Sequence, residues 1–209
     1  MRFVVLLRAV NVGGVKLAMA DLRELLEGLG LTDVRTYLQS GNAVVEAADE
    51  ATSPQTLATA VEVRIQRDVG PRVGVLVLPG ESLARVVAAN PFASVGATEC
   101  EAGEGTLHAT FLFGSADGEA DFGEASAAAY SAVYETAFCR LDLPTEGGEE
   151  AAFVGVPPLA APVVYLKLPR GYGRTKLNTA FFERKLGTAA TARNWRTVLA
   201  LSEMAGSDG

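Results

Sequence analysis

The stretch that decides the fold is FVVLLRAV at residues 3–10, followed by NVGG at 11–14 and MADLRELLEGL at 19–29. The first segment is apolar apart from Arg8 and rich in valine, which is typical of a strand buried on both faces. The third segment repeats its apolar side chains at helical spacing, namely at Met19, Leu22, Leu25, Leu26 and Leu29. A strand, a glycine turn and an amphipathic helix therefore open the domain.

The pattern continues through the first 91 residues as alternating strands and helices. After the opening pair we predict strands at 34–38 and 42–47, a helix from the cap Ser53 to 69, a strand at 72–78 and a helix at 81–89. The order βαββαβ predicts a ferredoxin-like arrangement, in which two helices pack on one face of the sheet.

The second half of the chain is predicted to be a diverged α+β copy of the first. We expect a connection over 92–105 and then strands at 106–113, 137–142, 151–156 and 163–168, with helices at 122–135, 179–186 and 192–205. The sequence thus predicts an α+β fold with one subdomain at 1–91 and a second at 106–209 that ends in two helices. A single continuous sheet built from both halves is the alternative.

Composition excludes several classes of protein. The 209 residues are 49% hydrophobic and 21% charged with a mean hydropathy of +0.21, as in a folded globular chain. Arg8 ends the first apolar run after five residues, which is too short for an export signal, and no stretch is long enough to span a membrane. Two isolated cysteines form no disulfide framework, so we expect a cytoplasmic protein without a membrane partner.

Charge is distributed unevenly along the chain. The net charge is −7, yet residues 1–17 carry +3 and residues 163–197 carry +7, which leaves −17 for the remainder. Twelve acidic residues between 99 and 150 lack the spacing of a cation site and are interpreted as a solvated surface. The two basic segments are the places where an anion would bind.

The first basic segment is a glycine turn between two cations. Consecutive glycines can direct backbone N–H groups into one concavity, and such a concavity binds anions. The candidate residues are Arg8, Asn11, Gly13, Gly14 and Lys16. A plain turn without a ligand is the alternative, because neither a Walker loop nor a dinucleotide fingerprint is present.

The second basic segment is a glycine-bearing loop that leads into a helix. Its candidates are Lys167, Arg174, Lys176 and the N-cap Asn178. We predict that the last helix starts at Thr191, with Arg193, Asn194 and Arg196 in its first turns. Cations at a helix N-terminus are repelled by the helix dipole, and a bound anion would compensate for this repulsion. The alternative is that these side chains reach into water or pair with acids.

Other chemistry has little support in the sequence. His108 lies alone in a predicted strand and is interpreted as structural. Cys100 and Cys139 have no activating neighbour, and no Cys/His cluster predicts a metal. No catalytic residue, metal or cofactor is therefore assigned, although Lys176 is the one candidate for proton transfer.

Both basic segments resemble one bacterial family, known as domain of unknown function 1697. The resemblance rests on Leu6-Leu7-Arg8 with Asn11-Val12-Gly13-Gly14, on Thr36 to Asn42, on Tyr165 to Pro169, on Thr175 to Asn178 and on Thr191 to Thr197. Ala9-Val10 stand where that family more usually shows Gly-Ile. The resemblance implies a two-part α+β protein with ferredoxin-like character and implies no activity.

The leading hypothesis is that the chain binds a phosphorylated or other anionic small molecule, for example a nucleotide. The proposed ligand-binding residues are Arg8, Asn11, Gly13, Gly14, Lys16, Ser40, Asn42, Lys167, Arg174, Lys176, Asn178, Arg193, Asn194 and Arg196. A nucleic-acid-binding module is one alternative, disfavoured by the acidic remainder but not excluded. A non-catalytic protein-interaction module is another, and self-association into a homo-oligomer stays open.

Overall fold

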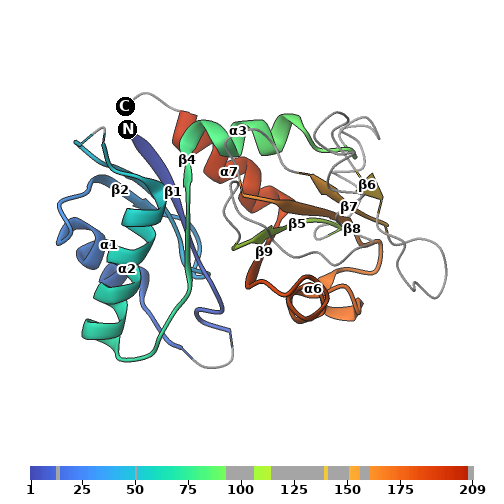
Figure 1. Ribbon diagram of the computed structural model, residues 1–209, viewed down its shortest axis with the longest axis horizontal. Helices are drawn as coiled ribbons and strands as arrows, with labels where there is room; N and C mark the ends of the chain where they lie inside the picture. Colours follow the sequence, from blue (N-terminus) through green and yellow to red (C-terminus); the bar gives the residue numbers. More distant parts are fainter. Residues whose placement is uncertain are drawn as a thin grey trace. The chain divides into compact units, whose positions relative to one another are not determined.

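A computed structural model describes residues 1–12, 15–49, 51–92, 106–113, 139–140, 151–155 and 161–206. The chain divides into two compact units (Figure 1). Unit 1 comprises Met1–Ala84 and Leu199–Gly209, and unit 2 comprises Arg85–Val198. Helices α3 (Gly80–Ala88) and α7 (Trp195–Gly206) each cross the boundary between the units.

Unit 1 is built on one antiparallel sheet and two helices. In chain order its elements are β1 (Arg2–Leu7), α1 (Met19–Glu27), β2 (Thr32–Thr36), β3 (Asn42–Glu46), α2 (Pro54–Val69) and β4 (Val75–Pro79). The strands lie in the order β2-β3-β1-β4 with antiparallel neighbours. Ser53 caps α2 as predicted, because its side chain accepts a hydrogen bond from the Thr56 N–H.

The core of unit 1 lies between this sheet and its two helices. Alternate residues of β1, β3 and β4 pack against the apolar stripes of α1 and α2, as Figure 1 shows for the layers. Val4 and Leu6, on the opposite face of β1, are also fully buried. Strand β1 is therefore buried on both faces, as the continuous apolar run predicted.

Unit 2 contains the second antiparallel sheet. Its elements are β5 (Leu107–Leu112), β6 (Cys139–Arg140), β7 (Ala151–Gly155), β8 (Val163–Lys167), the 3-10 turn η1 (Tyr172–Arg174), α6 (Thr179–Leu186) and β9 (Ala190–Asn194). The strand order is β6-β7-β8-β5-β9, and all neighbours are antiparallel.

Each face of the central strands in unit 2 is covered. Leu112, Val164 and Leu166 belong to one apolar cluster with Phe182 of α6. On the opposite face, Tyr165 is buried and its hydroxyl donates to the carbonyl of Val86 in α3 at 3.0 Å. Strand β8 is thus buried on both faces, and α6 covers one of these faces.

The predicted α+β class is confirmed, and the described strands form two sheets and not the single continuous sheet that the sequence left open. Several boundaries were wrong, including the start of the strand predicted over 72–78, which is Val75–Pro79. The strand predicted over 3–10 ends at Leu7, where the backbone turns into a positive-φ residue at Ala9. The hairpin strand predicted over 34–38 is Thr32–Thr36, and the helix predicted from Thr191 begins at Trp195 after an unpredicted strand, β9.

Two predictions concern residues that the structure does not describe. The helix predicted at 122–135 and, apart from Phe92, the connection predicted at 92–105 lie outside the described residues. Among the helices of the described ranges, none combines the length and apolar composition that crossing a bilayer requires.

Candidate functional site

The loop after β1 is held by the side chain of Asn11. Its Nδ2 donates to the carbonyls of Leu17 at 2.8 Å and Gln39 at 2.6 Å, and its Oδ1 accepts the Leu17 N–H at 3.0 Å. Asn11 and Ala9 both have positive φ, at 59° and 55°. Glycine adopts that conformation most readily, asparagine less so, and alanine holds it here at some cost. The amide of Asn11 is therefore part of the loop's own architecture.

The turn between β2 and β3 is equally constrained. Asn42 is fully buried, and its Nδ2 donates to the Tyr37 carbonyl and to the Ser40 Oγ, both at 2.9 Å. Gly41 has a φ of 70°, and a Cβ added there would lie 2.6 Å from the Cβ of Leu7. Only glycine fits this position. Asn11, Ser40 and Asn42 are thus brought into two adjoining loops of unit 1.

The cations of the first basic segment differ in exposure. Lys16 is exposed and Arg8 is half-buried. Gly13 and Gly14 lie outside the described residues, so the backbone concavity predicted there stays a prediction.

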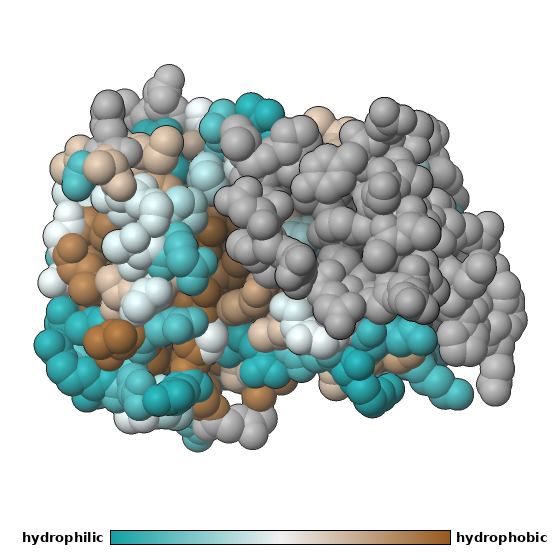
Figure 2. Space-filling view, viewed as in Figure 1, coloured by the Kyte–Doolittle hydropathy of each residue, from teal (hydrophilic) through white to brown (hydrophobic). Residues whose placement is uncertain are grey.

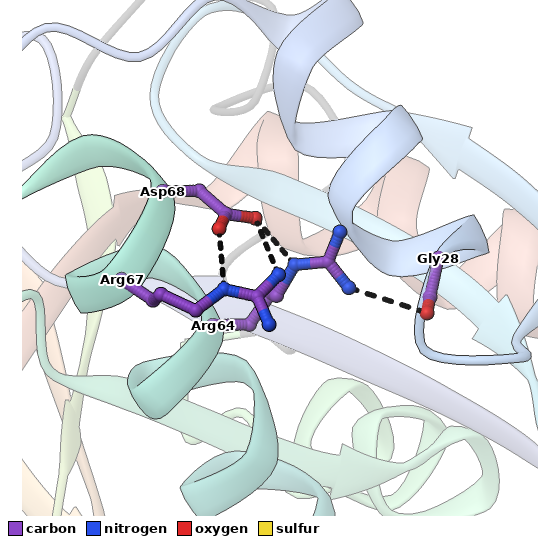
Figure 3. Close-up of polar contacts among 4 residues, drawn as sticks. All are labelled: Gly28, Arg64, Arg67 and Asp68. Carbon is purple, nitrogen blue, oxygen red and sulfur yellow. Dashed lines mark hydrogen bonds and ion pairs between the residues drawn. The ribbon is translucent and has the colours of Figure 1, made fainter.

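Elsewhere in unit 1 several arginines are paired with acids. Asp68 on α2 accepts hydrogen bonds from Arg64 and from Arg67, and Arg64 also donates to the Gly28 carbonyl at the end of α1 (Figure 3). Hydrogen bonds from Arg67 and then Arg64 lower the pKa of Asp68 to about 2. Arg35 similarly pairs with Asp33 at 3.1 Å.

The second basic segment, residues 163–197, contains the loop from the end of β8 to the start of α6. Residues 167–178 of this loop are called the basic loop below. Tyr172 fixes it to the unit. The Tyr172 hydroxyl accepts the Thr179 N–H at 2.9 Å and lies 2.8 Å from the Thr179 Oγ1. Its ring lies 4.8 Å, centroid to centroid, from the ring of His108 on β5. At the far end, Asn178 caps α6 as predicted by accepting the Phe181 N–H at 3.0 Å.

The cationic side chains of the basic loop face solvent. Arg170, Arg174 and Lys176 are exposed, and no ion pair joins them to any residue of the described part. Lys167, at the end of β8, is half-buried. The one acid between 163 and 197 is Glu183, and its Oε1 accepts the Ala190 N–H. The loop therefore presents positive charge on a fixed backbone.

Three candidate residues remain, and two of them lie on β9, a strand that the sequence does not predict. Arg193 and Asn194 belong to this edge strand and not to the first turn of a helix. Asn194 caps α7, because its Oδ1 accepts the Thr197 N–H at 2.8 Å. Arg196 is exposed and does lie in the first turn of α7.

Arg193 is buried, with 7% of its surface exposed. Its Nη1 donates to the Thr191 Oγ1 at 2.7 Å and to the Ala192 carbonyl at 2.8 Å. Burial lowers the pKa of its guanidinium to about 10, so the side chain is still charged at neutral pH. Arg193 is thus buried, whereas Arg170, Arg174 and Lys176 are exposed.

His108 lies on β5 and supports the basic loop, a role that the sequence does not predict. It is buried, and burial lowers the pKa of its imidazole to about 4. Its Nδ1 has no hydrogen-bond partner among the described residues, and neither does the buried Thr110 Oγ1 two residues along β5. His108 supports Tyr172 by ring contact, and no local sequence signal links residues so far apart. Within the described ranges, no group of three or more His, Cys, Asp or Glu side chains could hold a metal ion.

The fold defines an α+β protein with two antiparallel sheets, and comparison with known proteins gives its family. A family described as "Protein of unknown function (DUF1697)" matches residues 1–135, and the chain belongs to this family. The conserved bacterial protein SP0830 from Streptococcus pneumoniae has a similar structure. The identity is 22% and the TM-score 0.61 over 98% of each chain, a likeness that shows the fold alone. No curated protein matches the chain.

Proposed function

We propose that the protein binds a small phosphorylated or otherwise anionic molecule at the basic loop. One observation carries the proposal: Arg170, Arg174 and Lys176 are exposed, without an acidic partner in the described part, on a loop that Tyr172 pins to the sheet. A fixed backbone lowers the conformational entropy that binding costs, and guanidinium groups suit bidentate contacts with phosphate.

The small free energy of a single exposed ion pair favours a ligand with several negative charges. A single exposed ion pair contributes about 0–1 kcal/mol, so one monovalent anion would bind too weakly to matter. Three such contacts to one ligand give at most about 3 kcal/mol, which corresponds to a dissociation constant of several millimolar, and bidentate geometry improves on it. Pyrophosphate and nucleoside triphosphates are therefore better candidates than inorganic phosphate.

A long polyanion suits this surface less well. The chain outside the two basic segments carries −17, which would repel an extended nucleic acid. Tyr172, the aromatic residue of the basic loop, is half-buried between His108 and Thr179 and is not available to stack on bases. A nucleic-acid-binding function is kept as an outcome of the test.

Two further inferences accompany the proposal. We infer that unit 1 has the ferredoxin-like arrangement, supported by the strand order β2-β3-β1-β4 with antiparallel neighbours. We also infer a cytoplasmic location from the two isolated cysteines. That Arg8 and Lys16 bind an anion stays a prediction, and anion titration of the Arg8→Gln variant tests it.

The test is calorimetric titration with pyrophosphate, a nucleoside triphosphate and a short single-stranded oligonucleotide, at about 50 mM salt so that screening is weak. We expect Arg170→Gln/Arg174→Gln to weaken pyrophosphate binding about tenfold or more. The matched control is Arg184→Gln/Lys185→Gln, which removes two charges from the last turn of α6 in the same unit.

Equal weakening by both double variants would mean that net charge alone attracts the anion, and it would overturn the proposed site. Pyrophosphate binding that neither variant changes would do the same. Tighter binding of the oligonucleotide than of pyrophosphate would favour the nucleic-acid alternative.

A further inference from the structure

The sheet of unit 1 has a second apolar face, opposite the one that packs on α1 and α2. The strand pairings align one residue from each strand in a single row across this face, namely Arg35, Val44, Val4 and Leu78. Val4, Val44 and Leu78 are buried. The surface of unit 1, in contrast, mixes hydrophilic and hydrophobic residues, drawn teal and brown in Figure 2. This second face is therefore part of the interior and is covered.

The part of α7 that belongs to unit 1, residues 199–206, lies against the sheet and is called the α7 strap below. Arg35 Nη2 donates to the Met204 carbonyl at 2.7 Å, across 169 positions of sequence. A Cβ added to Gly80, directly after β4, would lie 3.2 Å from the Cβ of Ala205. Figure 1 shows the red end of α7 beside the start of α3. The strap thus contacts residues at β2 and β4, the two edge strands of the sheet.

Arg35 is suited to hold the end of this helix. The last four carbonyls of a helix have no partner within it, and the Met204 carbonyl is one of them in α7. A cation near a helix C-terminus also interacts favourably with the helix dipole. Asp33 pairs with Arg35 at 3.1 Å and orients the guanidinium. The hydrogen bond to Met204 is therefore charge-assisted and connects an edge strand to the strap.

We propose that the α7 strap is a closing element of unit 1, that Arg35 holds it in place, and that strap and sheet open as one cooperative unit. Detachment of the strap would expose the face of Val4, Val44 and Leu78 to water, which is unfavourable for apolar side chains. Leu201 and Ala205, four residues apart on the strap, would lose their burial at the same time. The alternative is a helix end that frays alone while the sheet stays closed.

The proposal is independent of anion binding, because strap and sheet lie in unit 1 and the basic loop lies in unit 2. The test is native-state hydrogen exchange of the full chain, followed by NMR. Groups that open together share one opening free energy, so we expect the amides of residues 201–205 to be as strongly protected as those of β1. Arg35→Gln should lower both protection factors about tenfold, because a charge-assisted hydrogen bond is lost.

Arg23→Gln is the matched control. Arg23 is an exposed residue of α1 that donates from Nη2 to the Thr36 Oγ1 at 3.2 Å, beside the same strand as Arg35. The substitution removes the same charge and one side-chain hydrogen bond without touching the strap. We expect it to change either protection factor by less than about twofold.

Equal protection of the strap and β1, lowered in both by Arg35→Gln and unchanged by Arg23→Gln, supports the proposal. A strap that exchanges rapidly while β1 stays protected overturns it. An effect of Arg35→Gln that is absent, confined to the strap, or matched by Arg23→Gln overturns it as well. If Arg35→Gln does not fold, the comparison of strap and β1 within the natural chain decides.

Discussion

In unit 1 the asparagine side chains that the sequence singles out are hydrogen-bonded within the fold, whereas in unit 2 the cations of the basic loop face solvent. The Asn11 side chain makes hydrogen bonds to three backbone groups, and Asn42 is fully buried. Arg170 and Arg174, in contrast, form no ion pair within the described residues. Both regions carry a polar and glycine-rich signature. The difference shows that such a signature can encode a turn as readily as a ligand site.

The largest expected effect tests the structural role of the unit 1 loops. Gly41→Ala puts a Cβ at 2.6 Å from the Leu7 Cβ and places alanine at a φ of 70°, and we expect it to lower the free energy of unfolding by about 3–4 kcal/mol. Gly30→Ala is the matched control, because Gly30 has a φ of 82° and no atom within 4 Å of the added Cβ. Chemical denaturation measures both. Equal losses in the two variants would show that the contact with Leu7 has no special weight.

The next effect compares the contributions of the two basic segments to the stability of the fold. Asn11→Ala removes three side-chain hydrogen bonds, and at about 1 kcal/mol each, less where they are exposed, we expect a loss of about 2–3 kcal/mol. Arg174→Gln should change the unfolding free energy by less than about 0.5 kcal/mol, because Arg174 is exposed. If the two substitutions had the same effect on stability, the contrast between an architectural loop and a surface loop would be lost.

A smaller effect concerns the support of the basic loop by His108. Burial lowers its pKa to about 4 in the folded protein, against an ordinary value of 6.5, so the unfolded chain binds more protons between these pH values. Stability should therefore fall as the pH drops from about 6.5 toward 4, by up to about 2 kcal/mol by pH 5. Thermal melts at pH 7 and pH 5 measure it.

His108→Phe supplies the comparison, because it keeps an aromatic ring against Tyr172 and cannot be protonated. We expect its melting temperature to depend less on pH than that of the natural chain over this range. Identical pH dependence in both proteins would assign the acid sensitivity to other groups.

Much of the fold follows from local sequence. The apolar run that forms β1, the spacing that forms α1 and the Ser53-Pro54 start of α2 all predict their elements correctly. Strand β9 could not be predicted in this way, because Ala190–Asn194 has no periodicity of its own and becomes a strand by pairing with β5. A local signal for the true helix start was present in Asn194, an N-cap residue directly before Trp195.

The candidate site was predictable in part. The sequence identified the basic loop and the capping role of Asn178, because both depend on neighbours in the chain. It could not reveal the burial of Arg193, which follows from the β9 register, or the contact of Tyr172 with His108, which joins residues 64 positions apart.

The central claim is that a small anion binds at the basic loop, and backbone NMR during titration with pyrophosphate tests it most directly. The account predicts saturable shifts of the amides between 168 and 178, with smaller shifts at His108 and Thr179, which contact Tyr172. Saturable shifts confined to the loop after β1, or no saturable shifts at all, would contradict the claim.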